Sequence, residues 1–158
     1  MPRKELAVIN VGILGLGVVG TGVVATLIDN ETSLSHITGR RVNLKSVLVR
    51  DKLRTREIEL PAGLLTTNAQ DILDDPDIHV LVEVMGGTDP AENYLRDALS
   101  AGKHVVTANK EVMAKSGPEL MAIARNNGAN LLFEASVGGG IPIVGTMMSE
   151  LAANDIRS

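Results

Sequence analysis

Short apolar runs alternate along the chain with longer stretches in which apolar residues recur every three or four positions. Nearly continuous apolar runs are typical of parallel strands buried on both faces, and the longer spacing is typical of helices that cover such a sheet. The pattern predicts strands at 7–14, 42–49, 78–84, 104–108 and 130–135, with a further short strand in the loop at 61–65. It predicts helices at 18–28 with a continuation toward 37, and at 68–73, 89–101, 118–127 and 142–153. The alternation indicates an α/β fold with a doubly wound, mostly parallel sheet and helices on both faces.

Local signals set the ends of some of these helices. Asp89 as N-cap, Pro90 as the first helical residue and Glu92 as the third form a helix start signal. Gly39 and Gly128 follow predicted helices and are expected to end them.

Composition narrows the classes of protein and of site. The 158 residues predict one domain without an internal linker. The absence of cysteine excludes disulfides, thiolate metal sites and a cysteine nucleophile, and it fits a cytoplasmic location. A net charge of −4 argues against a general nucleic-acid surface, and no apolar run reaches the length of about 18 residues that a membrane span needs. The first residues lack a cleavage-like site, so we expect no signal peptide.

A glycine motif opens the first predicted helix. Residues 15–20 read GLGVVG, a G-x-G-x-x-G that follows an apolar strand, which is the context of a dinucleotide-binding loop in a Rossmann-type fold. Gly15 permits the tight turn, Gly17 lets the pyrophosphate approach, and Gly20 lets helix and strand pack closely. The diphosphate would lie on free N–H groups at the helix start, whereas the alternative is a glycine-rich turn without a ligand. The residues predicted to bind the cofactor here are Gly15, Leu16, Gly17, Val18, Val19 and Gly20.

The end of the second strand bears on the choice of cofactor. An arginine there accommodates the 2′-phosphate of NADP, and an acidic residue binds the 2′-hydroxyl of NAD. In this chain Arg50 and Asp51 follow the strand, with Arg54 and Arg56 close behind. Arg50 favours NADP(H), Asp51 leaves NAD(H) open, and a solvated run of charges is the alternative.

Two further strand ends carry residues that could meet a ligand, because ligands lie at the carboxyl edge of doubly wound sheets. Gly86-Gly87-Thr88 precede a predicted helix, where small residues let a cofactor ring approach and the helix start adds N–H donors. Lys110 follows the strand at 104–108 and could hold a carboxylate, relay protons or contact the nicotinamide end. A plain turn and a surface lysine that begins a helix are the alternatives, and position alone does not separate them.

The last predicted strand contains an acidic residue and is followed by three glycines. Glu134 within an apolar strand is costly to bury unless it is paired or ligates something. Its carboxylate and the exposed carbonyls of the glycine run could form an oxygen-lined site for a hard cation. The alternative, which these residues alone favour slightly, is a solvent-facing glutamate beside a glycine hinge.

Four segments together resemble homoserine dehydrogenase: GILGLGVVGTGV, VLVEVMGG, VVTANKEVMA and FEASVGGGIPI, in this order. The likeness runs from about residue 11 to about residue 151, and ANK and FEASVGGGIP are its specific parts. The resemblance implies reversible reduction of L-aspartate-4-semialdehyde to L-homoserine with NADPH or NADH, on the route to threonine, methionine and isoleucine.

The resemblance also implies roles for particular residues. Positions 15–20 match the family's pyrophosphate loop, and 86–88 match its cofactor-contacting turn. Lys110 matches a lysine that lies between cofactor and substrate and is tied to catalysis. Glu134 matches the acidic end of a monovalent-cation site, usually Na⁺. That site also uses backbone carbonyls at positions matching Val137, Gly139 and Ile141.

Family members continue beyond this length into a substrate-binding and dimerising domain with a second catalytic lysine. Residues 1–141 are therefore expected to form the NAD(P)-binding domain and 142–158 the first helix toward that domain. A fragment of this kind would bind dinucleotide, turn over homoserine poorly and form homo-oligomers only through the missing domain. Two other functions stay open: a related oxidoreductase, such as an aspartate dehydrogenase or a dihydrodipicolinate reductase-like enzyme, and a non-catalytic dinucleotide sensor.

Overall fold

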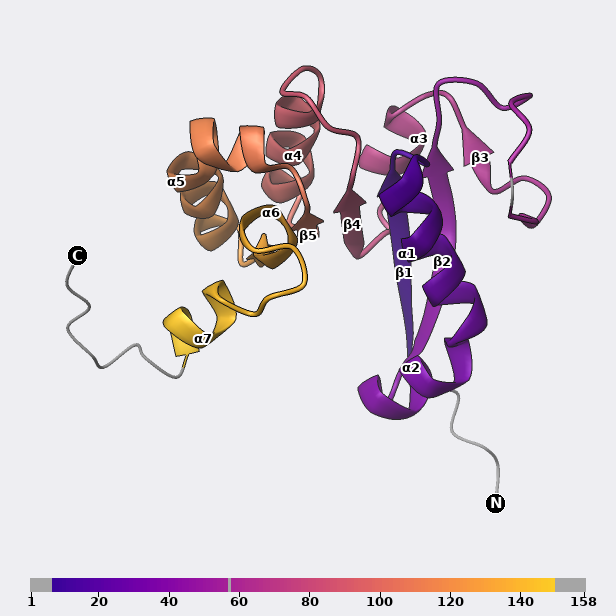
Figure 1. The fold of residues 1–158 in the computed structure, drawn as a ribbon, viewed down its shortest axis with the longest axis horizontal. Coiled ribbons are helices and arrows are strands. Elements are labelled where there is room, and N and C mark those ends of the chain that lie inside the picture. The colour runs from indigo at the N-terminus through magenta and orange to yellow at the C-terminus, as the bar shows by residue number, and fades with distance from the viewer. Residues whose placement is uncertain (1–6, 57, 150–158) are drawn as a thin grey trace.

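A computed structural model of the chain describes residues 7–56 and 58–149 (Figure 1). The described strands are β1 (Val8–Leu14), β2 (Arg41–Leu48), β3 (Leu65–Thr66), β4 (Val80–Glu83), β5 (His104–Thr107) and β6 (Leu131–Leu132). The described helices are α1 (Val18–Asp29), α2 (Glu31–Thr38), α3 (Gln70–Leu73), α4 (Ala91–Ser100), α5 (Lys110–Asn126), α6 (Glu134–Val137) and α7 (Val144–Ser149). None of the helices within these ranges is long and apolar enough to cross a membrane.

The strands form a single sheet in the order β3-β2-β1-β4-β5-β6, and every neighbouring pair is parallel. The chain builds outward from β1 to β3 on one side and then returns to place β4 on the other side of β1. The direction of winding reverses between β1 and β4, so their carboxyl ends leave a crevice where ligands bind in folds of this kind. The predicted doubly wound parallel sheet is confirmed.

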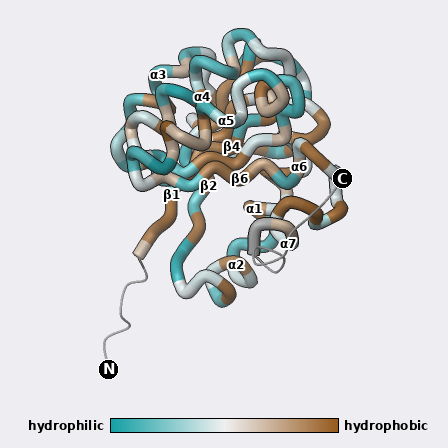
Figure 2. The backbone as a smooth tube through the Cα atoms, turned by 90° about the vertical axis from the view of Figure 1, so that its left-hand side faces the viewer, coloured by the Kyte–Doolittle hydropathy of each residue, from teal (hydrophilic) through white to brown (hydrophobic). Residues whose placement is uncertain are grey.

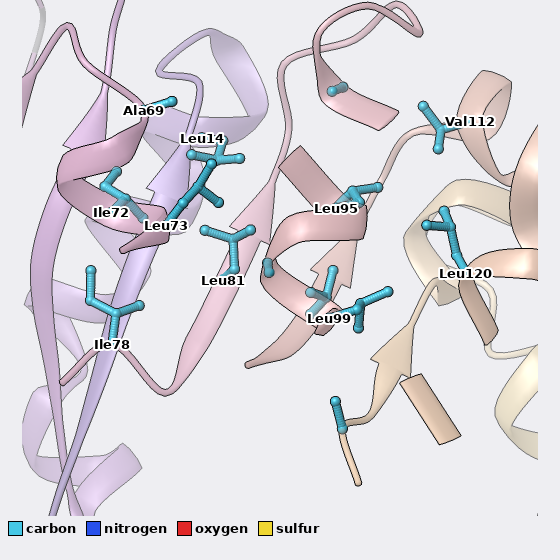
Figure 3. Close-up of a cluster of buried hydrophobic side chains, with 14 of the residues drawn as sticks. Leu14, Ala69, Ile72, Leu73, Ile78, Leu81, Leu95, Leu99, Val112 and Leu120 are labelled. Atoms are coloured by element: carbon cyan, nitrogen blue, oxygen red, sulfur yellow. The ribbon is translucent and has the colours of Figure 1, made fainter. Parts of the chain in front are cut away.

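Helices lie on both faces of the sheet, with α3, α4 and α5 on one side and α1, α2 and α7 on the other (Figure 2). The larger core cluster lies on the α4 side, where Leu14 and Leu81 of the sheet meet Leu95 and Leu99 of α4 (Figure 3). The buried residues of α4 fall at positions 91, 95, 98 and 99, one stripe of the helix. The 3.6-residue period therefore accounts for how this helix docks.

The smaller core cluster lies beneath α1 and contains Val11 and Ile13 of β1, Val47 of β2 and Val24 of α1. Ile13 and Leu14 point to opposite faces and are both fully buried, as expected of a central strand covered on both sides. The position of α1 follows from this cluster, and with it the position of the glycine loop that precedes the helix.

The predicted helix at 118–127 is wrong in its start, because α5 begins at Lys110 and Pro118 lies inside it. The side chain of Asn109 caps the start by accepting a hydrogen bond from the Val112 N–H (3.2 Å). An internal proline costs roughly 3 kcal/mol in an isolated helix. Burial of Val112 and Leu120 in the larger core cluster, which also contains α4 residues, offsets that cost here.

Two other predicted helix boundaries differ from the structure. The helix from residue 18 does not run unbroken toward 37, because Asn30 has φ −111° and ψ 19° and separates α1 from α2. Pro90, with φ −89° and ψ 7°, is the N-cap of α4, so Asp89 is not the cap and Pro90 is not the first helical residue. Gly39 does end α2, with φ 65°.

The predicted strand at 130–135 is also shorter in the structure, because β6 contains only Leu131–Leu132. Glu134 begins α6 and is not in a strand. Its carboxylate reaches the start of α7, which begins two residues after the predicted start at 142. Residues 150–153 of that predicted helix lie outside the described part of the chain.

Candidate functional site

A pocket of about 470 Å³ lies over the carboxyl ends of β1, β2 and β4. It occupies the crevice that the reversal of winding between β1 and β4 creates. The residues that line it come from the glycine loop, the end of β2 and the arginine segment after it, the segments after β3 and β4, and α4. They are Gly15, Leu16, Gly17, Leu48, Val49, Arg50, Asp51, Arg54, Arg56, Thr67, Val84, Met85, Pro90 and Tyr94.

The glycines of the loop have three different surroundings. Gly15 has φ +103°, a conformation that favours glycine, and its N–H donates to the Leu48 carbonyl oxygen (3.1 Å). A Cβ on Gly20 would lie 2.2 Å from the Gly15 carbonyl oxygen, so α1 packs directly on the turn. A Cβ on Gly17 would meet nothing within 4 Å, so this position faces open space. This geometry agrees with the tight turn predicted at Gly15 and the close packing predicted at Gly20, and the role of Gly17 toward a pyrophosphate stays a prediction.

The start of α1 offers hydrogen-bond donors next to that open space. The N–H groups of Val18, Val19 and Gly20 have no acceptor among the residues that the structure describes. Free N–H groups and the positive end of the helix dipole are what a diphosphate needs. Because Gly17 leaves room for close approach, the loop fits the pyrophosphate of a dinucleotide.

The segment after β2 gives the far end of the pocket a positive charge. Arg56 donates to the carbonyl oxygens of Asp51, Lys52 and Arg54 and so holds the turn between them. The carboxylate of Asp51 accepts from the Leu53 N–H (2.8 Å) and belongs to the same turn.

Two arginines of this segment remain available to a ligand. Arg50 and Arg54 line the pocket, and the guanidinium group of neither has a hydrogen-bond or ion-pair partner within residues 7–56 and 58–149. The far end therefore presents two guanidinium groups on a turn that a third arginine fixes.

The turn after β4 lies beside the pocket and does not line it, although Met85 directly before it does. Gly86 and Gly87 have φ values of 76° and 72°, a conformation that other residues rarely adopt. The Thr88 carbonyl oxygen accepts from the Glu92 N–H (2.8 Å) and joins the turn to the first residues of α4.

Lys110 is exposed as the first residue of α5 and does not line the pocket. Its neighbour Asn109 is buried and donates to the Gly87 carbonyl oxygen (2.7 Å). The structure therefore joins the ends of β4 and β5, although the two segments are more than twenty residues apart in sequence.

Glu83 is a fully buried carboxylate that the sequence analysis did not single out. It accepts hydrogen bonds from the Met85 N–H (2.8 Å), the Thr107 hydroxyl (2.6 Å) and, at 3.4 Å, the Asn109 amide. The signal was present in the sequence, because Glu83 is an acidic residue within the apolar run VLVEV. Thr67 and Tyr94 of the pocket give no such signal, because only the tertiary fold brings them there.

Glu134 lies away from the pocket and binds the start of α7. Its carboxylate oxygens accept from the N–H groups of Val144 (2.8 Å) and Gly145 (2.7 Å). The N–H groups of Gly145 and Val144 hold the pKa of this carboxyl below its usual value. The Ile141 carbonyl oxygen accepts from the Ile143 N–H (2.9 Å).

The remaining predicted cation ligands are backbone carbonyls. Those of Val137 and Gly139 accept no hydrogen bond from the described residues. The described residues contain no cluster of three or more His, Cys, Asp or Glu side chains that could hold a metal ion. A cation at this segment would be held by one carboxylate and several carbonyls.

The chain matches a family model described as "Homoserine dehydrogenase, NAD binding domain" over residues 15–134. It is 49% identical over 151 residues to a homoserine dehydrogenase of Bacillus subtilis, an alignment that covers 96% of this chain and 35% of that protein. The chain thus spans about a third of the length of the curated relatives that it matches.

Solved structures give the same picture. A homoserine dehydrogenase from Thiobacillus denitrificans matches with a TM-score of 0.86 and 41% identity, over 96% of this chain and 35% of that one. A hyperthermophilic archaeal homoserine dehydrogenase in complex with NADPH matches with a TM-score of 0.71 and 25% identity, over 89% of this chain and 48% of that one.

Proposed function

Because the chain belongs to the homoserine dehydrogenase NAD-binding domain family, we propose that it binds the nicotinamide dinucleotide with which that enzyme interconverts L-aspartate-4-semialdehyde and L-homoserine. The observation that carries this proposal is the pocket at the winding reversal. At one side it has the first N–H groups of α1, and at its far end two arginine side chains, all without a partner among the described residues. NADP(H) has its negative charges at matching places, on the pyrophosphate and on the 2′-phosphate of the adenosine ribose, whereas NAD(H) has only those of the pyrophosphate. An archaeal relative in complex with NADPH supports the same assignment.

We assign NADP(H) as the preferred cofactor, with NAD(H) as the second candidate. The guanidinium groups of Arg50 and Arg54, which have no partner in the part of the chain that the structure describes, can bind a 2′-phosphate by charge-assisted hydrogen bonds. The Asp51 carboxylate, which would bind the 2′-hydroxyl of NAD, accepts a backbone N–H within its own turn.

The glycine turn at 86–88 and Lys110 form the end of the proposed site at which the nicotinamide and the substrate react. When bound, the nicotinamide supplies or accepts the hydride. Lys110 contacts the substrate, places its carbonyl carbon and helps to move the proton to or from the carbonyl oxygen. Support comes from the hydrogen bond between Asn109 and Gly87, which holds the start of α5 next to the glycine turn.

We also propose a monovalent-cation site, for Na⁺, in the segment that follows β6. Its ligands are the Glu134 carboxylate and the carbonyls of Val137, Gly139 and Ile141, a set of oxygens that suits a hard cation. The site is supported by the Val137 and Gly139 carbonyl oxygens, which accept from no donor within residues 7–56 and 58–149, and by the remaining acceptor capacity of the carboxylate. The test compares melting temperatures in NaCl and in choline chloride at equal ionic strength. A difference that Glu134→Gln abolishes supports the site, and equal melting temperatures refute it.

The rest of the proposal concerns the complete enzyme. Residues 1–141 form its dinucleotide-binding domain, and residues 142–158 lead toward a domain that binds the substrate and joins subunits into a homo-oligomer. The enzyme acts in the cytoplasm on the route to threonine, methionine and isoleucine. Support comes from the extent of the curated relatives, of which this chain covers about a third.

Titration of this chain with NADPH and NADH, followed by the emission of the reduced nicotinamide, tests the proposed cofactor site. We expect saturable enhancement with both and a lower Kd for NADPH, and no change with either would refute the site. A dinucleotide sensor would give the same titration. The complete polypeptide is therefore assayed for homoserine-dependent reduction of NADP⁺, and activity there excludes the sensor.

A further inference from the structure

The buried carboxylate of Glu83 has no role in the pocket, because the side chain is fully buried and does not line it. It points to the α4 side of the sheet, the same side as the buried Leu81 two residues earlier. Its Cα is in register with that of Thr107 on β5. Core packing at this position needs only an apolar side chain, so the carboxylate requires a separate explanation.

The hydrogen-bond partners of Glu83 are all neutral. Its oxygens accept from the Met85 N–H, the Thr107 hydroxyl and the Asn109 amide, and no lysine or arginine of the described residues pairs with it. Burial of a carboxylate without a basic partner is unfavourable and is tolerated only when its acceptor sites are occupied. A group of this kind holds its donors in place, because a donor that moves away leaves a buried charge unsatisfied.

Two of the donors that Glu83 holds belong to different loops, and the third, Thr107, is the last residue of β5. The Met85 N–H belongs to the residue before Gly86 and Gly87, whose backbone is the least restricted of any residue. Asn109 precedes Lys110, donates to the Gly87 carbonyl oxygen and caps α5. Glu83 therefore cross-links the glycine turn to the start of α5.

We propose that Glu83 is a positioning residue that makes the glycine turn and the start of α5 one rigid unit. It thereby fixes Lys110 relative to the nicotinamide end of the cofactor. This inference rests on the proposed function for the role of Lys110, and it adds the group that sets the position of that lysine. Glu83 contacts neither cofactor nor substrate.

The conservative substitution Glu83→Gln separates geometry from charge. The glutamine oxygen can still accept from the Met85 N–H and the Asn109 amide, and its NH₂ can donate to the Thr107 hydroxyl. Glu83→Ala removes every one of these bonds. Lys103→Met is the matched control, because Lys103 is also buried and polar but donates to the Asp75 and Ile78 carbonyls at the other end of the sheet.

The first readout needs no ligand. Amide hydrogen exchange of this chain is measured by mass spectrometry at a temperature where circular dichroism shows every variant folded. We expect Glu83→Ala to raise exchange in the segments around 85–88 and 109–112, Glu83→Gln to stay close to the wild type, and Lys103→Met to leave both segments unchanged. Equal exchange in these segments for Glu83→Ala and the wild type would overturn the proposal, whatever the cofactor or activity.

The second readout is chemical. In Glu83→Ala we expect the emission enhancement of NADPH at saturation to fall on this chain. In the complete enzyme we expect kcat to fall by about tenfold to a hundredfold, because small misplacements of reacting groups are costly. Glu83→Gln should keep most of the emission enhancement and most of kcat, and Lys103→Met should change neither quantity. A glutamine variant as defective as the alanine variant would overturn positioning by hydrogen bonds. A complete enzyme inactive on homoserine would refute the proposed function, while the exchange comparison would still decide the role of Glu83.

Discussion

Replacement of Gly20 by alanine tests the closest contact of the dinucleotide loop. The new Cβ would lie 2.2 Å from the Gly15 carbonyl oxygen, whereas real Cβ contacts essentially never fall below 3.0 Å. The start of α1 must therefore move away from the turn by about 0.8 Å, the difference between these two distances. The movement opposes the packing of the fully buried Val24 against the sheet.

Two effects of opposite sign set the change in stability of Gly20→Ala. Overpacking of a tight contact costs about 1–3 kcal/mol, and alanine gains about 1 kcal/mol over glycine in a helix. Gly22→Ala is the matched control, because Gly22 is in the same helix and its Cβ would meet nothing within 4 Å. Gly22→Ala has only the favourable effect, so we expect it to exceed Gly20→Ala in stability by about 1–3 kcal/mol. For a chain of this size the difference corresponds to roughly 2–12 °C in Tm.

Gly17→Ala completes the series. Gly17 has φ −86° and ψ −158° and open space at its Cβ, so the variant should fold, at a cost of up to about 1 kcal/mol for a weaker N-cap. The methyl group would occupy the space where the pyrophosphate approaches. We expect NADPH binding to weaken strongly in Gly17→Ala and Gly20→Ala, and to be retained in Gly22→Ala.

The assays are thermal unfolding by circular dichroism and NADPH titration by fluorescence, on the same protein samples. Equal Tm values for Gly20→Ala and Gly22→Ala would refute the argument that α1 packs rigidly on the turn. Undiminished NADPH binding by Gly17→Ala would show that the pyrophosphate does not lie on this loop.

Three further predictions concern other parts of the chain. Arg50→Ala should weaken the binding of NADPH more than that of NADH in parallel titrations. Equal losses of affinity would show that Arg50 does not bind the 2′-phosphate. Lys110→Ala in the complete enzyme should lower kcat strongly with a smaller effect on cofactor affinity, and an unchanged kcat would exclude a chemical role. Hydrogen bonds from Arg96, Lys115 and Ser116 hold the pKa of Glu92 at about 2, so its stabilising contribution is present above pH 4.5 and is lost as the pH falls toward 2. The Tm difference between the wild type and Glu92→Gln should shrink as the pH falls over that range. A constant difference would show that the ionised Glu92 carboxylate does not stabilise the fold.

Much of the fold could be predicted because its signals are local. Apolar runs marked the strands, and the glycine motif marked the turn between β1 and α1. The errors occurred where a helix cap or a tertiary contact outweighed the preference of a single residue. Pro118 is a typical first residue of a helix, yet α5 runs through it because the Asn109 cap and the burial of Val112 stabilise the preceding turns. Glu134 followed an apolar run, but hydrogen bonds to α7 place it in a helical turn.

The sequence alone determined the parallel sheet, the glycine turn between β1 and α1 and the positive segment after β2, because each depends on residues that are neighbours in the chain. Only the tertiary structure decided which strand ends meet. The Cα atoms of Glu83 and Thr107 are paired across β4 and β5, and Asn109 reaches Gly87 from more than twenty residues away. The register of parallel strands sets that meeting, and no local pattern encodes it. For that reason Lys110 and the acidic residue Glu83 both stand out in the sequence, whereas the hydrogen bonds by which Glu83 joins the glycine turn to the start of α5 could not be predicted from it.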